Sequence, residues 1–104
     1  MGMQEIMRQA QQMQKKIAQI QEEMANRTVS ASSGGGMVTV TASGSQEVTD
    51  IQIDPTVVDP DDVGMLQDLV VAATNEALKK SREMMEEEMS KVTGGVKLPG
   101  MGMM

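Results

Sequence analysis

Near the start of the chain, apolar residues recur every three or four positions, and the residues between them are mainly Gln, Glu, Lys, Arg and Asn. The apolar positions are Met3, Ile6, Ala10, Met13, Ile17, Ile20 and Met24. An α-helix turns once in about 3.6 residues, so this spacing predicts a helix over residues 3–26 with one narrow apolar seam. Another helix usually covers such a seam, and the pattern therefore predicts an assembly of helices.

The periodicity changes from helical to alternating after residue 27. Over residues 37–43, apolar side chains alternate with Thr and Ser, which predicts a half-buried strand. Two further strands are predicted at about 28–32 and 47–53, with glycine turns between the three. Val48 is out of phase with the apolar residues that follow it, which favours a β-bulge or a late start of the third strand. Together these strands predict an antiparallel meander with one apolar face.

A second helix is predicted over residues 60–93. Asp59 is a suitable N-cap and Pro60 suits the first helical position. The apolar stripe that follows changes face near residues 78–81, so either one kinked helix or two helices would fit the pattern. The order α-β-β-β-α defines an α+β fold, in a single domain over residues 1–97, and the Met- and Gly-rich residues 98–104 are expected to be a flexible tail.

The composition removes several classes of function. The 104 residues include 13 Met but no Phe, Tyr, Trp, Cys or His, so the core lacks aromatic bulk and dimerisation would help to stabilise the fold. Without Cys there is no thiol chemistry, and without His the commonest general base and metal ligand is missing. We therefore expect neither an enzyme nor a small-molecule substrate, and no cofactor. No apolar run reaches membrane-spanning length, which favours a cytoplasmic protein.

Two short motifs invite a binding site and are better explained by local structure. Gly34-Gly35-Gly36 precedes a strand and has no nearby Lys, so a hairpin turn is favoured over a phosphate-binding loop. Four acids cluster at positions 54–62, but their spacing does not fit a calcium-binding loop. Helix capping accounts for these acids, and no metal site is predicted.

The distribution of charge is uneven along the chain, whose net charge is −6. All nine Lys and Arg residues lie within residues 1–27 and 79–104, whereas residues 28–78 carry only acidic groups. Composition alone favours solvated helix faces with ion pairs four residues apart, such as Lys79 with Glu83. By itself this charge pattern does not identify a function.

Several segments, in this order and spacing, resemble one known family. They are residues 7–16 (MRQAQQMQKK), 21–24 (QEEM), 36–41 (GMVTVT), 53–55 (IDP), 62–70, 73–77 (ATNEA) and 94–100. The resemblance is to the YbaB/EbfC family of bacterial nucleoid-associated proteins, and it covers nearly the whole chain. It implies a tweezer-like homodimer in the nucleoid whose helical arms bind double-stranded DNA with little sequence specificity.

The resemblance also implies which residues contact DNA, because the basic residues all lie on the expected arms. The positions it implies are Arg8, Lys15, Lys16, Arg27, Lys79, Lys80, Arg82 and Lys91. The chain departs from the family at Thr39 and Gln52, where basic residues are common, and it places the acids Glu86, Glu87 and Glu88 on an arm. The alternative interpretation is a protein-interaction scaffold that uses the helical seam and the Met-rich surface without binding DNA.

Overall fold

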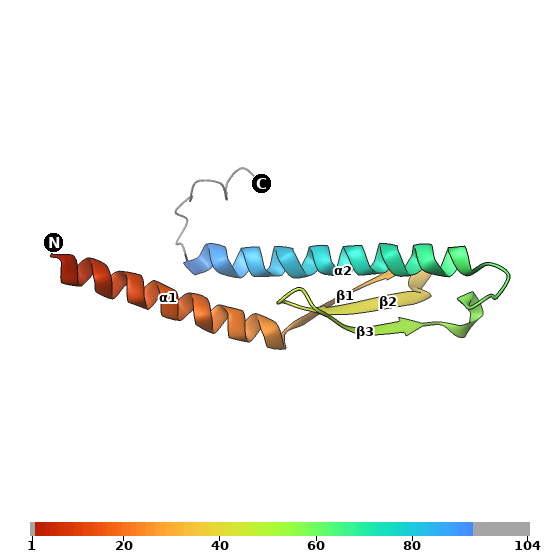
Figure 1. Cartoon of the computed structure of the whole chain (residues 1–104), viewed down its shortest axis with the longest axis horizontal. Coiled ribbons are helices and arrows are strands. Elements are labelled where there is room, and N and C mark those ends of the chain that lie inside the picture. Colours follow the sequence, from red (N-terminus) through yellow and green to blue (C-terminus); the bar gives the residue numbers. More distant parts are fainter. Residues whose placement is uncertain (1, 93–104) are drawn as a thin grey trace.

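A computed structural model describes residues 2–92 of the chain and shows a helix, three strands and a second long helix (Figure 1). The elements are α1 (Met3–Asn26), β1 (Thr28–Ser33), β2 (Val38–Ser43), β3 (Val48–Ile53) and α2 (Val63–Val92), with short 3₁₀ turns at Gly34–Gly36 and Pro55–Val57. The α-β-β-β-α order and the α+β class expected from the sequence are confirmed. The expected tail at residues 98–104 lies outside the described residues.

The three strands form an antiparallel sheet in the order β1-β2-β3. Val40 of β2 pairs with Ala31 on one side and with Ile51 on the other, so these three side chains share one face of the sheet. The register between β2 and β3 shifts next to Val48, where Thr49 is the additional residue. The irregularity suggested by the phase of Val48 is therefore a β-bulge.

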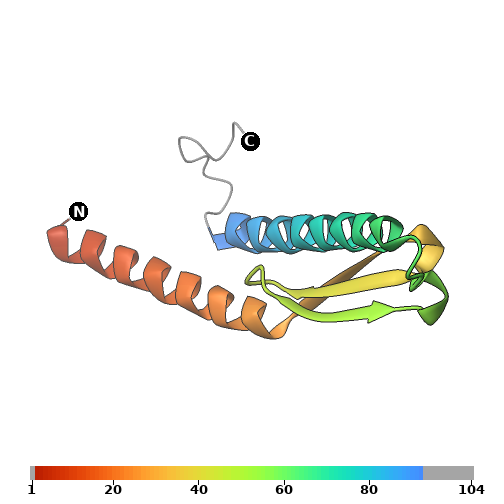
Figure 2. The ribbon, with the colours of Figure 1, turned by 45° about the vertical axis from the view of Figure 1, so that its right-hand side comes forward.

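Helix α2 covers the apolar face of the sheet over β1 and β2 (Figure 2). The core between them is built from small and β-branched side chains: Ala31, Val38, Val40, Ala42, Val57, Ala73 and Ala77. The alanines on α2 let the helix approach the sheet closely, which explains how the fold manages without aromatic residues. On β3 the apolar face is left open, and Ile51 and Ile53 are 43% and 39% exposed.

Helix α2 is one uninterrupted helix, which settles the choice between a continuous and a divided segment. Ala73, Ala77 and Ser81 are buried along its first part. Beyond Ser81 the half-buried positions include Met84 and Val92. The apolar stripe changes face because α2 packs first on the sheet and then against α1.

The start of α2 differs from the sequence-based expectation by three residues. The helix begins at Val63, and the carboxylate of Asp62 accepts the backbone N–H of Met65 at 3.3 Å, as an N-cap does. The Asp59 carboxylate instead accepts the N–H of Asp61 at 2.9 Å and closes a turn before the helix. The prediction of Asp59 as N-cap was wrong because this acid satisfies a local turn, a common alternative use of Asp.

The molecule is elongated, with principal extents of 70 × 27 × 16 Å. Its radius of gyration is 19.1 Å, against about 13 Å for a compact chain of this length. Helix α1 projects beyond the end of α2, so its N-terminal half forms an arm without a partner in the described chain (Figures 1 and 2). The seam expected to be covered by a helix is covered only in part: Met24 is fully buried, whereas Met3 is 77% exposed.

Candidate nucleic-acid interface

The position of the α1 arm is fixed where the helix ends. The Met24 carbonyl accepts the N–H of Gly44 at 2.8 Å and that of Arg27 at 3.2 Å. These bonds satisfy a carbonyl that would have no hydrogen-bond partner within the helix. Ser81 of α2 donates its hydroxyl to the Ser43 carbonyl at 2.6 Å, inside the same junction. The turn between β2 and β3 thus joins the base of α1 to the sheet and to α2.

Three predicted contact residues lie on α1 and are exposed. Arg8 and Lys15 are seven residues apart, which places them on nearly the same face of the helix about 10 Å apart along its axis. Lys16 is the next residue after Lys15, so its side chain leaves the helix in a different direction, and it lines the groove between α1 and α2. Among residues 2–92, none of the three forms an ion pair or a side-chain hydrogen bond.

Three more predicted residues lie near the middle of α2. Lys79 and Arg82 share a face, are exposed, and have no ionic partner within the described part of the chain. Lys80 behaves differently, because its ammonium group donates to the Ser30 carbonyl of β1 at 3.0 Å. Lys80 is therefore directed toward the sheet, and it would have to leave Ser30 to contact another molecule.

The remaining two predicted residues are both engaged by one carboxylate. Oε1 of Glu88 accepts from Lys91 Nζ at 3.1 Å and from Arg27 Nη1 at 3.3 Å. The hydrogen bond from Lys91, then the positive charge of Lys91, and then the hydrogen bond and charge of Arg27 hold the pKa of Glu88 below its usual value. This role of Glu88 was not predicted from the sequence, although its spacing of three residues from Lys91 was a visible signal.

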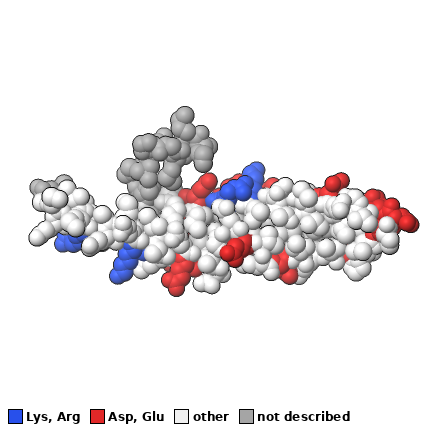
Figure 3. All heavy atoms as spheres, in the orientation of Figure 1, with Lys and Arg blue, Asp and Glu red and all other residues white. Residues whose placement is uncertain are grey.

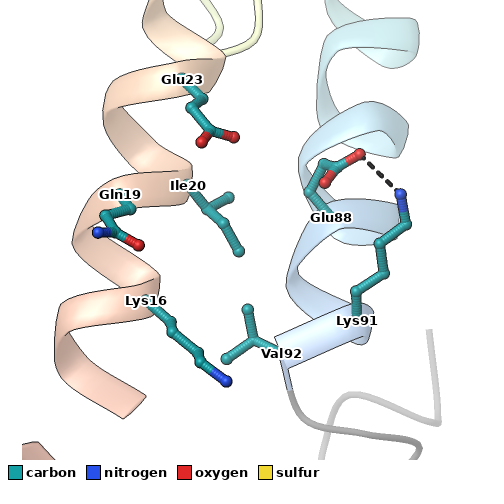
Figure 4. Close-up of a pocket in the computed structure, with 7 residues that line it drawn as sticks. All are labelled: Lys16, Gln19, Ile20, Glu23, Glu88, Lys91 and Val92. Carbon is teal, nitrogen blue, oxygen red and sulfur yellow. Dashed lines mark hydrogen bonds and ion pairs between the residues drawn. The ribbon is translucent and has the colours of Figure 1, made fainter. Parts of the chain in front are cut away.

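Glu88 and Lys91 lie beside a groove of about 180 Å³ between the two helices (Figure 4). Helix α1 contributes Lys16, Gln19, Ile20 and Glu23, and α2 contributes Glu88, Lys91 and Val92. The lining is mixed in charge and open to solvent, so it suits two packed helix surfaces better than a small-molecule pocket.

The Lys and Arg side chains form two groups on the surface (Figure 3). In that view the Lys and Arg atoms of α1 lie along one edge and those of α2 along the opposite edge. Asp and Glu atoms lie at the far end, where the sheet leads into α2, and also along the middle of the molecule beside both groups of cations. The structure therefore presents two separate groups of cations on one chain. It does not merge the eight predicted positions into a single patch.

The acids at the far end serve as local caps. Asp54 accepts both the N–H and the hydroxyl of Thr56, at 2.9 and 2.8 Å, and these hydrogen bonds lower the pKa of Asp54. Among the described residues, no group of three or more Asp and Glu side chains is arranged to hold a metal ion. Within the same residues, neither helix is both long and apolar enough to cross a bilayer.

Comparison with known proteins gives a consistent assignment. A "Nucleoid-associated protein" of Moorella thermoacetica is 57% identical over 99 residues, covering 95% of each chain. One from Desulforamulus reducens is 54% identical over 100 residues, covering 96% of this chain and 95% of its own. The crystal structure of an uncharacterised protein from Helicobacter pylori superposes with a TM-score of 0.81 at 26% identity, over 90% of this chain and 99% of that one. The sequence model of the YbaB/EbfC DNA-binding family matches residues 1–96, and the chain belongs to this family.

Proposed function

We propose that this protein is a nucleoid-associated protein that binds double-stranded DNA through the phosphate backbone, with little sequence specificity. The observation that carries the proposal is a set of exposed cations, on the two helices of a family member, that have no ionic partner within residues 2–92. These cations are Arg8, Lys15, Lys16, Lys79 and Arg82. Arg27, Lys80 and Lys91 are the other predicted contact residues, and each has a protein partner that a phosphate would have to displace.

Phosphate contact explains why these residue types suffice for the function. Lys and Arg neutralise phosphates and release counterions, and such contacts carry no sequence information. The chain has no aromatic side chain to stack on an unpaired base, which favours duplex over single-stranded DNA. The far end carries acids and no Lys or Arg and would be repelled by DNA, so the end that carries the Lys and Arg residues is expected to face the duplex.

Binding should depend steeply on salt and little on sequence. If about four to six phosphates are neutralised, the plot of log affinity against log salt should have a slope of roughly −4 to −5. Fluorescence anisotropy with several unrelated 20–30 base-pair duplexes, over a series of KCl concentrations, measures this slope. A protein that binds no duplex even at low salt would contradict the proposal and favour the alternative below.

The alternative function is a protein-interaction scaffold. The observation in its favour is the exposed apolar seam of the α1 arm, which includes Met3, Ile6 and Met13. The same seam, together with the open apolar face of β3, is also available for the homodimer that we propose as the DNA-binding form.

We expect the wild-type protein to sediment as a dimer at micromolar concentration, and Ile51→Asp to sediment as a monomer. The reason is that Ile51 lies on the open apolar face of β3, where a buried unpaired carboxylate would oppose association. Gln52→Asp is the matched control, because Gln52 belongs to the same strand and points to the opposite face of the sheet. A monomeric wild type, or an Ile51→Asp variant that remains dimeric, would rule out this interface.

A further inference from the structure

We propose that Glu88 restrains DNA binding by holding Arg27 and Lys91 away from phosphates. The inference rests on the DNA binding proposed above and adds a residue that sets its strength. Glu88 would act by competing with DNA for two cations of the interface, without itself touching DNA.

The geometry shows that one carboxylate oxygen engages both cations. Oε1 of Glu88 lies 3.1 Å from Lys91 Nζ and 3.3 Å from Arg27 Nη1. The side chains of Arg27 and Lys91 are 53% and 64% exposed, whereas that of Glu88 is 20% exposed. Solvent and ligands can therefore reach both cations. Their availability for a phosphate is limited by the ion pair with Glu88.

The two cations come from distant parts of the sequence. Arg27 follows the last residue of α1, and Lys91 lies one turn from Glu88 near the end of α2. The pairing of Arg27 with Glu88 depends on the junction at Gly44, which brings the end of α1 against α2. The fold itself therefore creates the shared ion pair.

The carboxylate remains charged at physiological pH. Hydrogen bonds from Lys91 and Arg27 favour the ionised form of Glu88, and its pKa is lowered. The restraint is thus a constant property of the folded protein, and we expect no change in its effect between pH 6 and 8.

The neighbouring acids provide a matched comparison. Glu86 and Glu87 are exposed on the same helix turn and form no ion pair among the described residues. Removing the charge of Glu87 changes the net charge as much as removing that of Glu88, but it releases no cation. A difference between the two variants therefore isolates the shared ion pair from the general loss of repulsion.

The first experiment compares wild type, Glu88→Gln and Glu87→Gln in DNA-binding titrations with a fluorescent duplex at several KCl concentrations. Each added phosphate contact steepens the salt slope by about 0.9 and raises affinity about eightfold near 0.1 M salt. We therefore expect Glu88→Gln to bind at least eightfold more tightly, with a slope steeper by about one to two. Glu87→Gln should change affinity by a much smaller factor and leave the slope nearly unchanged.

The second experiment is a double-mutant cycle. Arg27→Gln and Lys91→Gln should weaken wild-type binding only slightly, because both cations are already paired with Glu88. In the Glu88→Gln background the same substitutions should remove most of the gained affinity. Circular dichroism and sedimentation of each variant establish that the fold and the association state are retained.

The outcomes separate the restraint from the proposed function. If wild type binds DNA and Glu88→Gln matches Glu87→Gln, the restraint is wrong and the proposed function stands. A gain that persists without Arg27 and Lys91 also overturns the restraint. If neither wild type nor Glu88→Gln binds, both proposals fail, whereas binding by Glu88→Gln alone would support the restraint.

Discussion

Reversal of charge at Lys15 and Lys16 is expected to reduce DNA affinity by roughly 100-fold near 0.1 M salt and to flatten the salt slope by about two. Both residues are exposed on the α1 arm and have no ionic partner among residues 2–92, so nothing in the described protein compensates the change. All duplexes should be affected alike, because phosphate contacts carry no sequence information. Titration of the Lys15→Glu/Lys16→Glu variant against several duplexes measures both effects.

Lys97→Glu is the control for this reversal, because it changes the charge as much as either single substitution and Lys97 is not one of the predicted contact positions. It should have little effect on affinity. The helix content and the sedimentation of the double variant should equal those of wild type, since neither lysine contributes to the buried core. Unchanged DNA affinity in the double variant would remove Lys15 and Lys16 from the interface.

Gly44→Ala is expected to cause the largest loss of stability, about 2–3 kcal/mol in the free energy of unfolding. A Cβ at this position would lie 2.7 Å from the Met24 carbonyl oxygen and 2.8 Å from the Met24 side chain. The carbonyl belongs to the backbone at the base of α1, so relief of the clash would displace the whole arm. The melting temperature should fall by about 10–20 °C for a domain of this size.

Gly64→Ala is the matched control for the Gly44 substitution. A Cβ at Gly64 meets nothing within 4 Å, and alanine is the better helix former, so this variant should be as stable as wild type or slightly more stable. Thermal unfolding of the three proteins is compared at one fixed concentration, because the dimerisation that we propose would make the melting temperature depend on concentration. A Gly44→Ala variant as stable as Gly64→Ala would show that Met24 can move to make room for a Cβ at Gly44 without loss of stability.

Local periodicity was sufficient to predict the elements of this chain. The spacing from Met3 to Met24 gave a helix whose bounds match α1, and the alternation around Val38 and Val40 gave the central strand. The phase of Val48 indicated the bulge beside it. These signals are reliable because a helix and a strand each impose their own repeat on the residues that face a core. The start of α2 was harder to predict, because several acids before it compete for the same local hydrogen bonds.

The sequence also determined where cations could occur, since every Lys and Arg lies outside residues 28–78. The sequence could not reveal which of them would be paired. Arg27 and Glu88 are 61 positions apart, and their contact exists only because the junction at Gly44 brings α1 against α2. Of the eight predicted positions, the fold leaves Lys15 and Lys16 exposed and without an ionic partner among the described residues, but it pairs Arg27 and Lys91 with Glu88.

Burial was likewise decided by the tertiary structure. The apolar face of the sheet includes both Val40 and Ile51, which are neighbours in the register, yet Val40 is buried and Ile51 is exposed. A helix about 10 Å wide covers about two strands spaced about 4.8 Å apart, so α2 protects β1 and β2 but leaves β3 open. The alternation of apolar residues therefore determined which face of each strand is apolar. The number of helices above the sheet decided how much of that face remains available to a partner.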